Sequence, residues 1–88
     1  MSGLDQMLRL QKFSLDEKRR QAADLDALIE RLRGDVRRLD EDVAREIETA
    51  RGNLDLERAR PEYRKVMAER RERILKSIAD LSTELEKL

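Results

Sequence analysis

The stretch between residues 25 and 43 carries an apolar side chain at alternating intervals of four and three residues. The residues concerned are Leu25, Ile29, Leu32, Val36, Leu39 and Val43. This spacing is the heptad repeat of a coiled coil, in which apolar residues occupy the a and d positions of each seven-residue unit. Most of the residues between them are charged, so the apolar stripe is narrow. A helix of this kind has to pack its stripe against another helix.

A second seam of the same period lies in the C-terminal part of the chain. Its d positions are Met67, Ile74, Leu81 and Leu88, and its a positions are Arg64, Arg71, Ile78 and Leu85. If the chain folds back on itself, a positions face d positions and the numbers of facing residues sum to 110, as for Val36 with Ile74. Two seams in a common register are what an antiparallel helical hairpin requires.

Residues between the two seams signal a change of direction. Gly52-Asn53 is typical of a helix end, and Pro61 suits the first turn of a new helix. We therefore expect an all-α fold, an antiparallel two-helix coiled-coil hairpin that forms a single domain. The predicted boundaries are about residues 4–51 for helix one, 52–60 for a connector with at most a short helical turn, and 61–88 for helix two.

The heptad register of helix one continues towards the N-terminus through Leu15, Leu8 and Leu4. By the sum of 110, their facing positions would lie beyond residue 88. Two explanations stay open: the native second helix is longer and this sequence is truncated at its C-terminus, or these leucines pair with another copy of the chain or fray. A second capping pattern beginning at Ser14 also leaves open a break in helix one near that residue, although a continuous helix is favoured.

Composition restricts the chemistry that this chain can perform. Charged residues make up 45% of its 88 residues and aromatic residues only 2%, which is typical of long helices without a large core. Histidine and cysteine are absent, which removes the commonest general base and the commonest transition-metal ligands. The carboxylates are expected on solvated helix faces without a pocket, so we expect no enzyme, no metal site and no cofactor.

Nucleic acids and membranes are also poor candidates for partners. The chain has 20 basic and 20 acidic residues, and the acidic residues interrupt the basic runs, unlike the dense basic region of a zipper that binds DNA. Without a run of about 18 apolar residues, we expect no insertion into a membrane. The N-terminal sequence lacks the apolar segment of a secretion signal, which favours the cytoplasm.

Protein binding is the class of function that remains. Some apolar residues lie outside the regular seam: Phe13 is on the outer face of helix one, and the others gather near the turn. The turn residues have two interpretations, a small cluster that closes the tip or a docking patch for a partner. The candidate partner-binding residues are Phe13, Ile47, Leu54, Leu56, Tyr63 and Val66.

Two parts of the chain resemble a known family. The N-terminal runs Leu8-Arg9-Leu10, Lys12-Phe13 and Asp16-Glu17-Lys18-Arg19-Arg20 resemble the opening of the flagellar export protein FliJ. The run Ala68-Glu69-Arg70-Arg71-Glu72-Arg73, followed by Ser77-Ile78-Ala79, is similar to the second helix of that family. Chains of the family are typically longer than this one, which favours a native second helix that continues beyond residue 88.

The resemblance implies a coiled-coil component of the flagellar type III protein export apparatus. Such a protein lies in the cytoplasm, peripheral to the apparatus at the inner membrane. It couples the export ATPase hexamer to the cytoplasmic region of the export gate, and it handles export chaperones. The alternative interpretation is a generic structural coiled coil that forms a homodimer through Leu4, Leu8 and Leu15.

Overall fold

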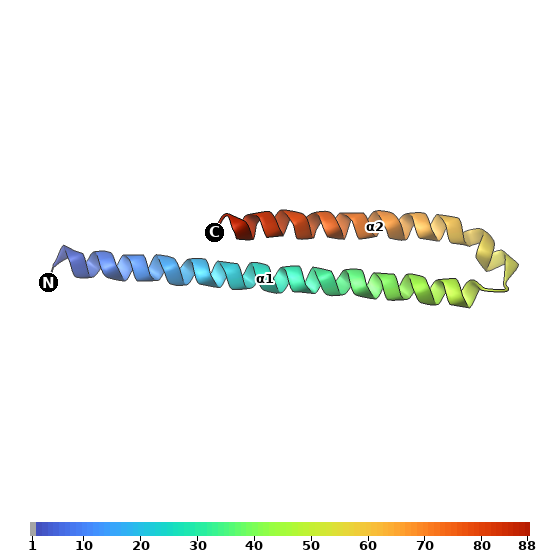
Figure 1. Cartoon of the computed structure of the whole chain (residues 1–88), viewed down its shortest axis with the longest axis horizontal. Coiled ribbons are helices and arrows are strands. Elements are labelled where there is room, and N and C mark those ends of the chain that lie inside the picture. Colours follow the sequence, from blue (N-terminus) through green and yellow to red (C-terminus); the bar gives the residue numbers. More distant parts are fainter. Residues whose placement is uncertain (1) are drawn as a thin grey trace.

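The computed structural model describes residues 2–88, which form two long helices joined by a tight turn (Figure 1). Helix α1 spans Gly3–Ala50 and helix α2 spans Leu54–Glu86. The helices run antiparallel in a rod that measures 80 × 16 × 12 Å. No strand occurs within the described residues. The all-α helical hairpin predicted from the two seams is therefore confirmed.

Helix α1 is continuous over 48 residues. Ser2 caps its N-terminus, because the hydroxyl of Ser2 accepts a hydrogen bond from the backbone N–H of Asp5 at 3.4 Å. No break occurs near Ser14. Six ion pairs support the helix, each between an acidic residue and an arginine three positions later, a spacing that contributes about 0.2–0.5 kcal/mol per pair. The pairs are Asp16–Arg19, Glu17–Arg20, Glu30–Arg33, Asp35–Arg38, Asp42–Arg45 and Glu48–Arg51.

The turn between the helices consists of three residues, Arg51 to Asn53. Gly52 has a φ of 80°, a left-handed conformation in which a side chain would be strained. The side chain of Asn53 then caps α2, because its oxygen accepts a hydrogen bond from the backbone N–H of Leu56 at 3.2 Å. The predicted end of helix one near Arg51 is confirmed.

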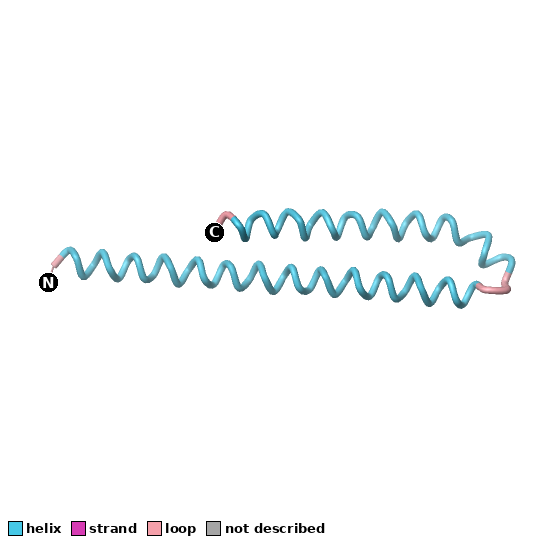
Figure 2. The backbone as a smooth tube through the Cα atoms, viewed as in Figure 1, coloured by secondary structure: helices cyan, strands magenta, loops and turns pink. Residues whose placement is uncertain are grey.

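The predicted connector over residues 52–60 is wrong, because α2 begins at Leu54 and contains Pro61 as its eighth residue. The Asn53 cap, and the acidic Asp55 and Glu57 in the first turn, favour helix formation before the proline. Proline has no N–H to complete the helical hydrogen-bond ladder, and its ring pushes against the preceding turn. The helix bends near its N-terminal end instead of stopping (Figures 1 and 2).

The packing register follows from which side chains lose contact with solvent. In α1 the seam residues are all buried or half-buried: Ala22, Leu25, Ile29, Leu32, Val36, Leu39, Val43, Ile47 and Ala50. The matching half-buried residues of α2 are Leu85, Leu81, Ile78, Ile74, Arg71, Met67, Tyr63 and Arg60. From Leu25 with Leu85 to Ala50 with Arg60, each pair of numbers sums to 110. Facing residues also line common hollows, as Val43 and Met67 do.

The heptad spacing shifts once in each helix, and the two shifts face each other. In α1 the residue after Val43 that packs inward is Ile47 rather than Glu46, and in α2 Tyr63 takes the place of Arg64. Two successive intervals of four residues form a stutter, which locally unwinds a left-handed supercoil. Because the stutters lie at Val43 and Met67, which are facing positions, the sum of 110 is preserved up to the turn.

The stutter changes the ion pairs near the turn. Strict heptads continued past Val43 would place Glu46 opposite Arg64 and predict a salt bridge between them. Both side chains are exposed, however, and no ion pair joins them within residues 2–88. Arg71 instead reaches from α2 to α1. Its Nε donates a hydrogen bond to Oδ1 of Asp40 at 3.0 Å, and its Nη2 donates to Oδ2 at 3.4 Å.

Double-mutant cycles should distinguish these two pairs. Asp40→Ala and Arg71→Ala are expected to couple by no more than about 1 kcal/mol in the free energy of unfolding, because both side chains are partly exposed. Glu46→Ala and Arg64→Ala should give additive losses. Urea denaturation of the single and double variants measures both couplings. Coupling at Glu46–Arg64 without coupling at Asp40–Arg71 would contradict the register shift.

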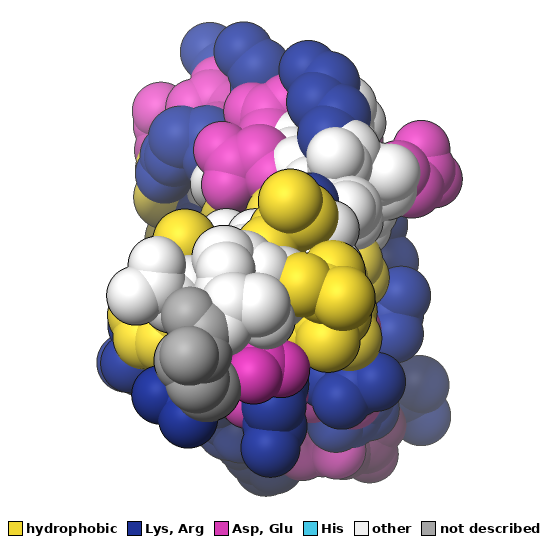
Figure 3. Space-filling model, turned by 90° about the vertical axis from the view of Figure 1, so that its left-hand side faces the viewer, with side chains coloured by type: hydrophobic (Ala, Val, Ile, Leu, Met, Phe, Trp, Pro, Cys, Tyr) yellow, Lys and Arg dark blue, Asp and Glu magenta, His cyan; other side chains and the backbone are white. Residues whose placement is uncertain are grey.

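The N-terminal part of α1 extends past the end of α2 (Figure 1). We call residues 3–21 the overhang. Its leucines Leu4, Leu8 and Leu15 are exposed, as predicted from the absence of facing residues within the chain. Viewed end-on from this side, the molecule shows hydrophobic side chains lying among charged ones (Figure 3).

Candidate protein-binding surfaces

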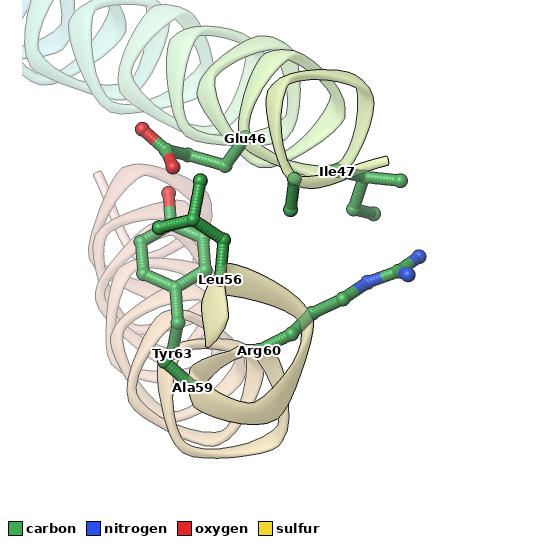
Figure 4. A pocket seen from close by; sticks show the side chains of 7 residues that line it. Glu46, Ile47, Leu56, Ala59, Arg60 and Tyr63 are labelled. Atoms are coloured by element: carbon green, nitrogen blue, oxygen red, sulfur yellow. The ribbon is translucent and has the colours of Figure 1, made fainter. Parts of the chain in front are cut away.

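The tip of the hairpin contains a small apolar cavity of about 170 Å³ between the two helices. Its lining residues are Glu46, Ile47, Ala50, Leu56, Ala59, Arg60 and Tyr63. Leu56 and Tyr63 project side by side from α2 towards α1 (Figure 4). The short side chains of Ala50 and Ala59 allow the bent start of α2 to approach α1, and Ala50 is one of the buried residues of the protein.

Arg60 occupies a seam position at this end and lies opposite Ala50. Its Nε atom is buried and has no hydrogen-bond partner among the described residues. The guanidinium group extends away from the cavity (Figure 4). The side chain up to Nε therefore packs beside the turn, while the terminal nitrogens of the guanidinium group point away from the cavity.

The structure separates the six candidate partner-binding residues into two groups. Ile47 and Tyr63 are half-buried, and together with Leu56, which is 46% exposed, they line the tip cavity. The other three do not line this cavity, and their side chains are exposed to solvent: Phe13 is 68% exposed, Leu54 63% and Val66 49%.

The overhang carries two exposed apolar residues that the sequence reasoning did not single out, Met7 and Leu10. Met7 precedes Leu8 at a flanking g position of the heptad, and it broadens the apolar stripe of the overhang. Counting only a and d positions missed it. A search for apolar residues that flank the seam on both sides would have found it.

The charged groups of the described residues are spread along both helices. Of the seven ion pairs among these residues, five lie within α1, one joins Glu48 of α1 to Arg51 of the turn, and one joins the two helices. In residues 2–88 we found no group of three or more acidic side chains placed to hold a metal ion. Neither helix, over the residues described, has an apolar stretch long enough to cross a membrane.

Comparisons of the chain with protein-family models, with curated proteins and with solved structures gave no match. The fold and its two exposed apolar regions are thus the structural basis for assigning a function. The resemblance to the FliJ family remains a prediction from the sequence.

Proposed function

We propose that this chain is a coiled-coil component of the flagellar type III protein export apparatus. In this role it couples the export ATPase hexamer to the cytoplasmic region of the export gate and handles export chaperones. It would act in the cytoplasm, peripheral to the apparatus at the inner membrane. The observation that carries the proposal is the antiparallel hairpin, which is the fold that the family resemblance implies.

The shape of the hairpin suits a mechanical coupling element. Helix α1 is unbroken along most of an 80 Å rod that is only 16 × 12 Å in cross-section. Rods of packed helices transmit displacement from one end to the other because their interiors resist compression. The balanced charge of 20 basic and 20 acidic residues creates no strong field of one sign, which favours movement within a ring over fixed electrostatic attachment.

A second candidate function, of a different class, is that of a structural coiled coil that dimerises through its N-terminal seam. The exposure of Leu4, Leu8 and Leu15 favours it. The two functions differ in the partner that they require. A coupling protein needs the export ATPase, whereas a structural coiled coil needs only its own copies.

Capture of the purified export ATPase by the tagged chain tests the proposal. We expect Leu54→Asp and Val66→Asp, each alone, to weaken capture about tenfold or more while thermal stability is retained, because both side chains are exposed, Leu54 at the first position of α2 and Val66 in the half of α2 nearer the turn. Ala27→Asp is the matched control, since it adds the same charge to the outer face of α1 in the middle of the rod. Absence of capture by the unmodified chain, or equal capture by all three variants, would contradict docking through the tip.

A further inference from the structure

Two half-buried arginines of α2, Arg60 and Arg71, lie at seam positions. Arg71 has a carboxylate partner on α1, because its Nε and Nη2 donate hydrogen bonds to the two carboxylate oxygens of Asp40. The Nε of Arg60 is buried without a hydrogen-bond partner, and no ion pair joins this arginine to an acidic side chain within residues 2–88. We propose that the tip of the hairpin binds an acidic segment of another protein, in which a carboxylate pairs with Arg60 and a neighbouring apolar side chain enters the tip cavity.

The register of the hairpin explains why this carboxylate has to come from outside the chain. The numbers of Asp40 and Arg71 sum to 111, and by the same sum the position that would serve Arg60 is 51. That position holds a second arginine, Arg51, whose Nη2 lies 3.7 Å from Oε2 of Glu48. The turn therefore places a cation where the middle of the rod places an acid, and a partner with negative charge is favoured.

The acidic residue that lines the tip cavity does not supply the missing acceptor. Glu46 and the hydroxyl end of Tyr63 lie on one side of the cavity, and the guanidinium group of Arg60 extends from the other side (Figure 4). In this position the Nε of Arg60 reaches neither solvent nor a protein acceptor, which is unfavourable. Because no ion pair fixes the guanidinium group, it can turn so that Nε and one terminal nitrogen both donate to a carboxylate, as those of Arg71 do.

The tip cavity has room for one apolar side chain. Its volume of about 170 Å³ is close to the roughly 150 Å³ of an apolar cavity that holds one benzene molecule, so an isobutyl or phenyl group would fill it. Its apolar lining comes mainly from Ile47, Ala50, Leu56 and Ala59.

The occupant also has to cover surface outside the cavity. Leu56 lines the cavity, yet its side chain is 46% exposed. A small carboxylic acid that fills the cavity would leave this outer surface in contact with water. The residues on either side of an anchoring side chain in a protein segment can cover it, which favours a protein segment over a small molecule.

This inference goes beyond the proposed function, because it states the chemistry of a docking segment and holds whether or not that segment belongs to the export ATPase. Its test uses peptides and contains no component of the export apparatus. Loss of ATPase capture and loss of peptide binding are therefore separate results.

Selection of random twelve-residue peptides, displayed on phage, against the full chain tests the chemistry of the occupant. We expect enrichment of peptides in which leucine, isoleucine or phenylalanine lies beside aspartate or glutamate. The most enriched peptide is then synthesised with a fluorescent label, and its Kd is measured by fluorescence anisotropy. Replacing its acidic residue with lysine should weaken binding about tenfold or more, because Arg51 and Arg60 would then face a like charge.

Four variants of the chain test the two parts of the site with the synthetic peptide. Arg60→Gln removes the charge and should weaken binding about three- to tenfold, and Ala59→Leu fills the cavity from within and should weaken it about tenfold or more. Arg58→Gln and Ala79→Leu are the matched controls, since they make the same changes at exposed residues of α2 that do not line the cavity. Both controls should bind the peptide as the unmodified chain does.

Thermal unfolding separates a role of Arg60 in binding from a role in folding. Arg60→Met keeps an unbranched side chain and removes the unpartnered Nε, so the melting temperature should be unchanged or higher while peptide binding is lost. A lower melting temperature with full peptide binding would show that Arg60 serves the fold alone, and it would overturn the proposal.

The peptide experiments can also reject the site. Failure to enrich any peptide, enrichment of basic or neutral peptides, or equal losses in the control variants would each contradict an acidic segment at the tip. Displacement of the labelled peptide by 4-methylpentanoate as efficiently as by the unlabelled peptide would assign the cavity to a small acid and would reject the protein segment.

Discussion

Replacing Ile29 with alanine is expected to lower the free energy of unfolding by about 2–4 kcal/mol, with the result near the lower end of that range. Ile29 is the most deeply buried of the core residues, at 4% exposure, and its seam partner is Leu81. The loss combines the removed apolar contact with the cavity that is left behind. A layer between only two helices can partly collapse, which reduces the second contribution. Urea denaturation followed by circular dichroism measures the change.

Leu28→Ala is the matched control, because it removes an aliphatic side chain of the same size from the adjacent position. Leu28 is 39% exposed, so we expect a loss well below that of Ile29→Ala. The loss from Ile29→Ala should also be less than additive with that from Leu81→Ala, since the two residues share a layer. Equal losses at positions 28 and 29, or strict additivity with position 81, would show that the register is different.

Much of this fold could be predicted because apolar periodicity directly reports burial. The seam of α1 from Leu25 to Val43, and that of α2 from Met67 to Leu85, predicted two helices, their antiparallel orientation and their register. The exposure of Leu4, Leu8 and Leu15 followed from the same register. These features depend on spacing alone, and spacing is fully contained in the sequence.

The turn region was harder to predict because two local signals compete there. Pro61 was interpreted as the start of helix two, but the Asn53 cap and the acidic first turn favour helix seven residues earlier. The helix tolerates the proline by bending. The predicted Glu46–Arg64 salt bridge is absent for a related reason: strict heptads were extended past Val43, where the buried residues shift to Ile47 and Tyr63.

The candidate binding residues could be located only as a group. An apolar residue near a turn has the same appearance in the sequence whether it closes the tip or faces a partner. The bend of α2 determines which residues line the tip and which face solvent. It directs Leu56 and Tyr63 into the cavity and leaves Leu54 in solvent. Pro61 causes α2 to bend at this place, but the direction of the bent segment relative to α1 depends on packing between the two helices, which local sequence does not specify.

The second large effect is expected at the tip, where Ile47→Asp should cost about 1–3 kcal/mol in the stability of that end of the hairpin. The substitution removes apolar contact with the cavity shared by Leu56 and Tyr63, and it places a carboxylate in the gap between the helices. Because the tip is an end of the rod, it can open without unfolding the layers around Ile29. Amide hydrogen exchange should therefore accelerate over residues 44–63 and change little around residue 29.

Leu54→Asp provides the comparison for this test, since it introduces the same carboxylate at the first residue of α2. Leu54 is 63% exposed, and a negative charge at a helix N-terminus is favourable, so stability should be unchanged or slightly higher. Accelerated exchange in Leu54→Asp but not in Ile47→Asp would reverse the assignment of the two residues. Leu54 would then hold the tip together, and Ile47 would be the residue left free for a partner.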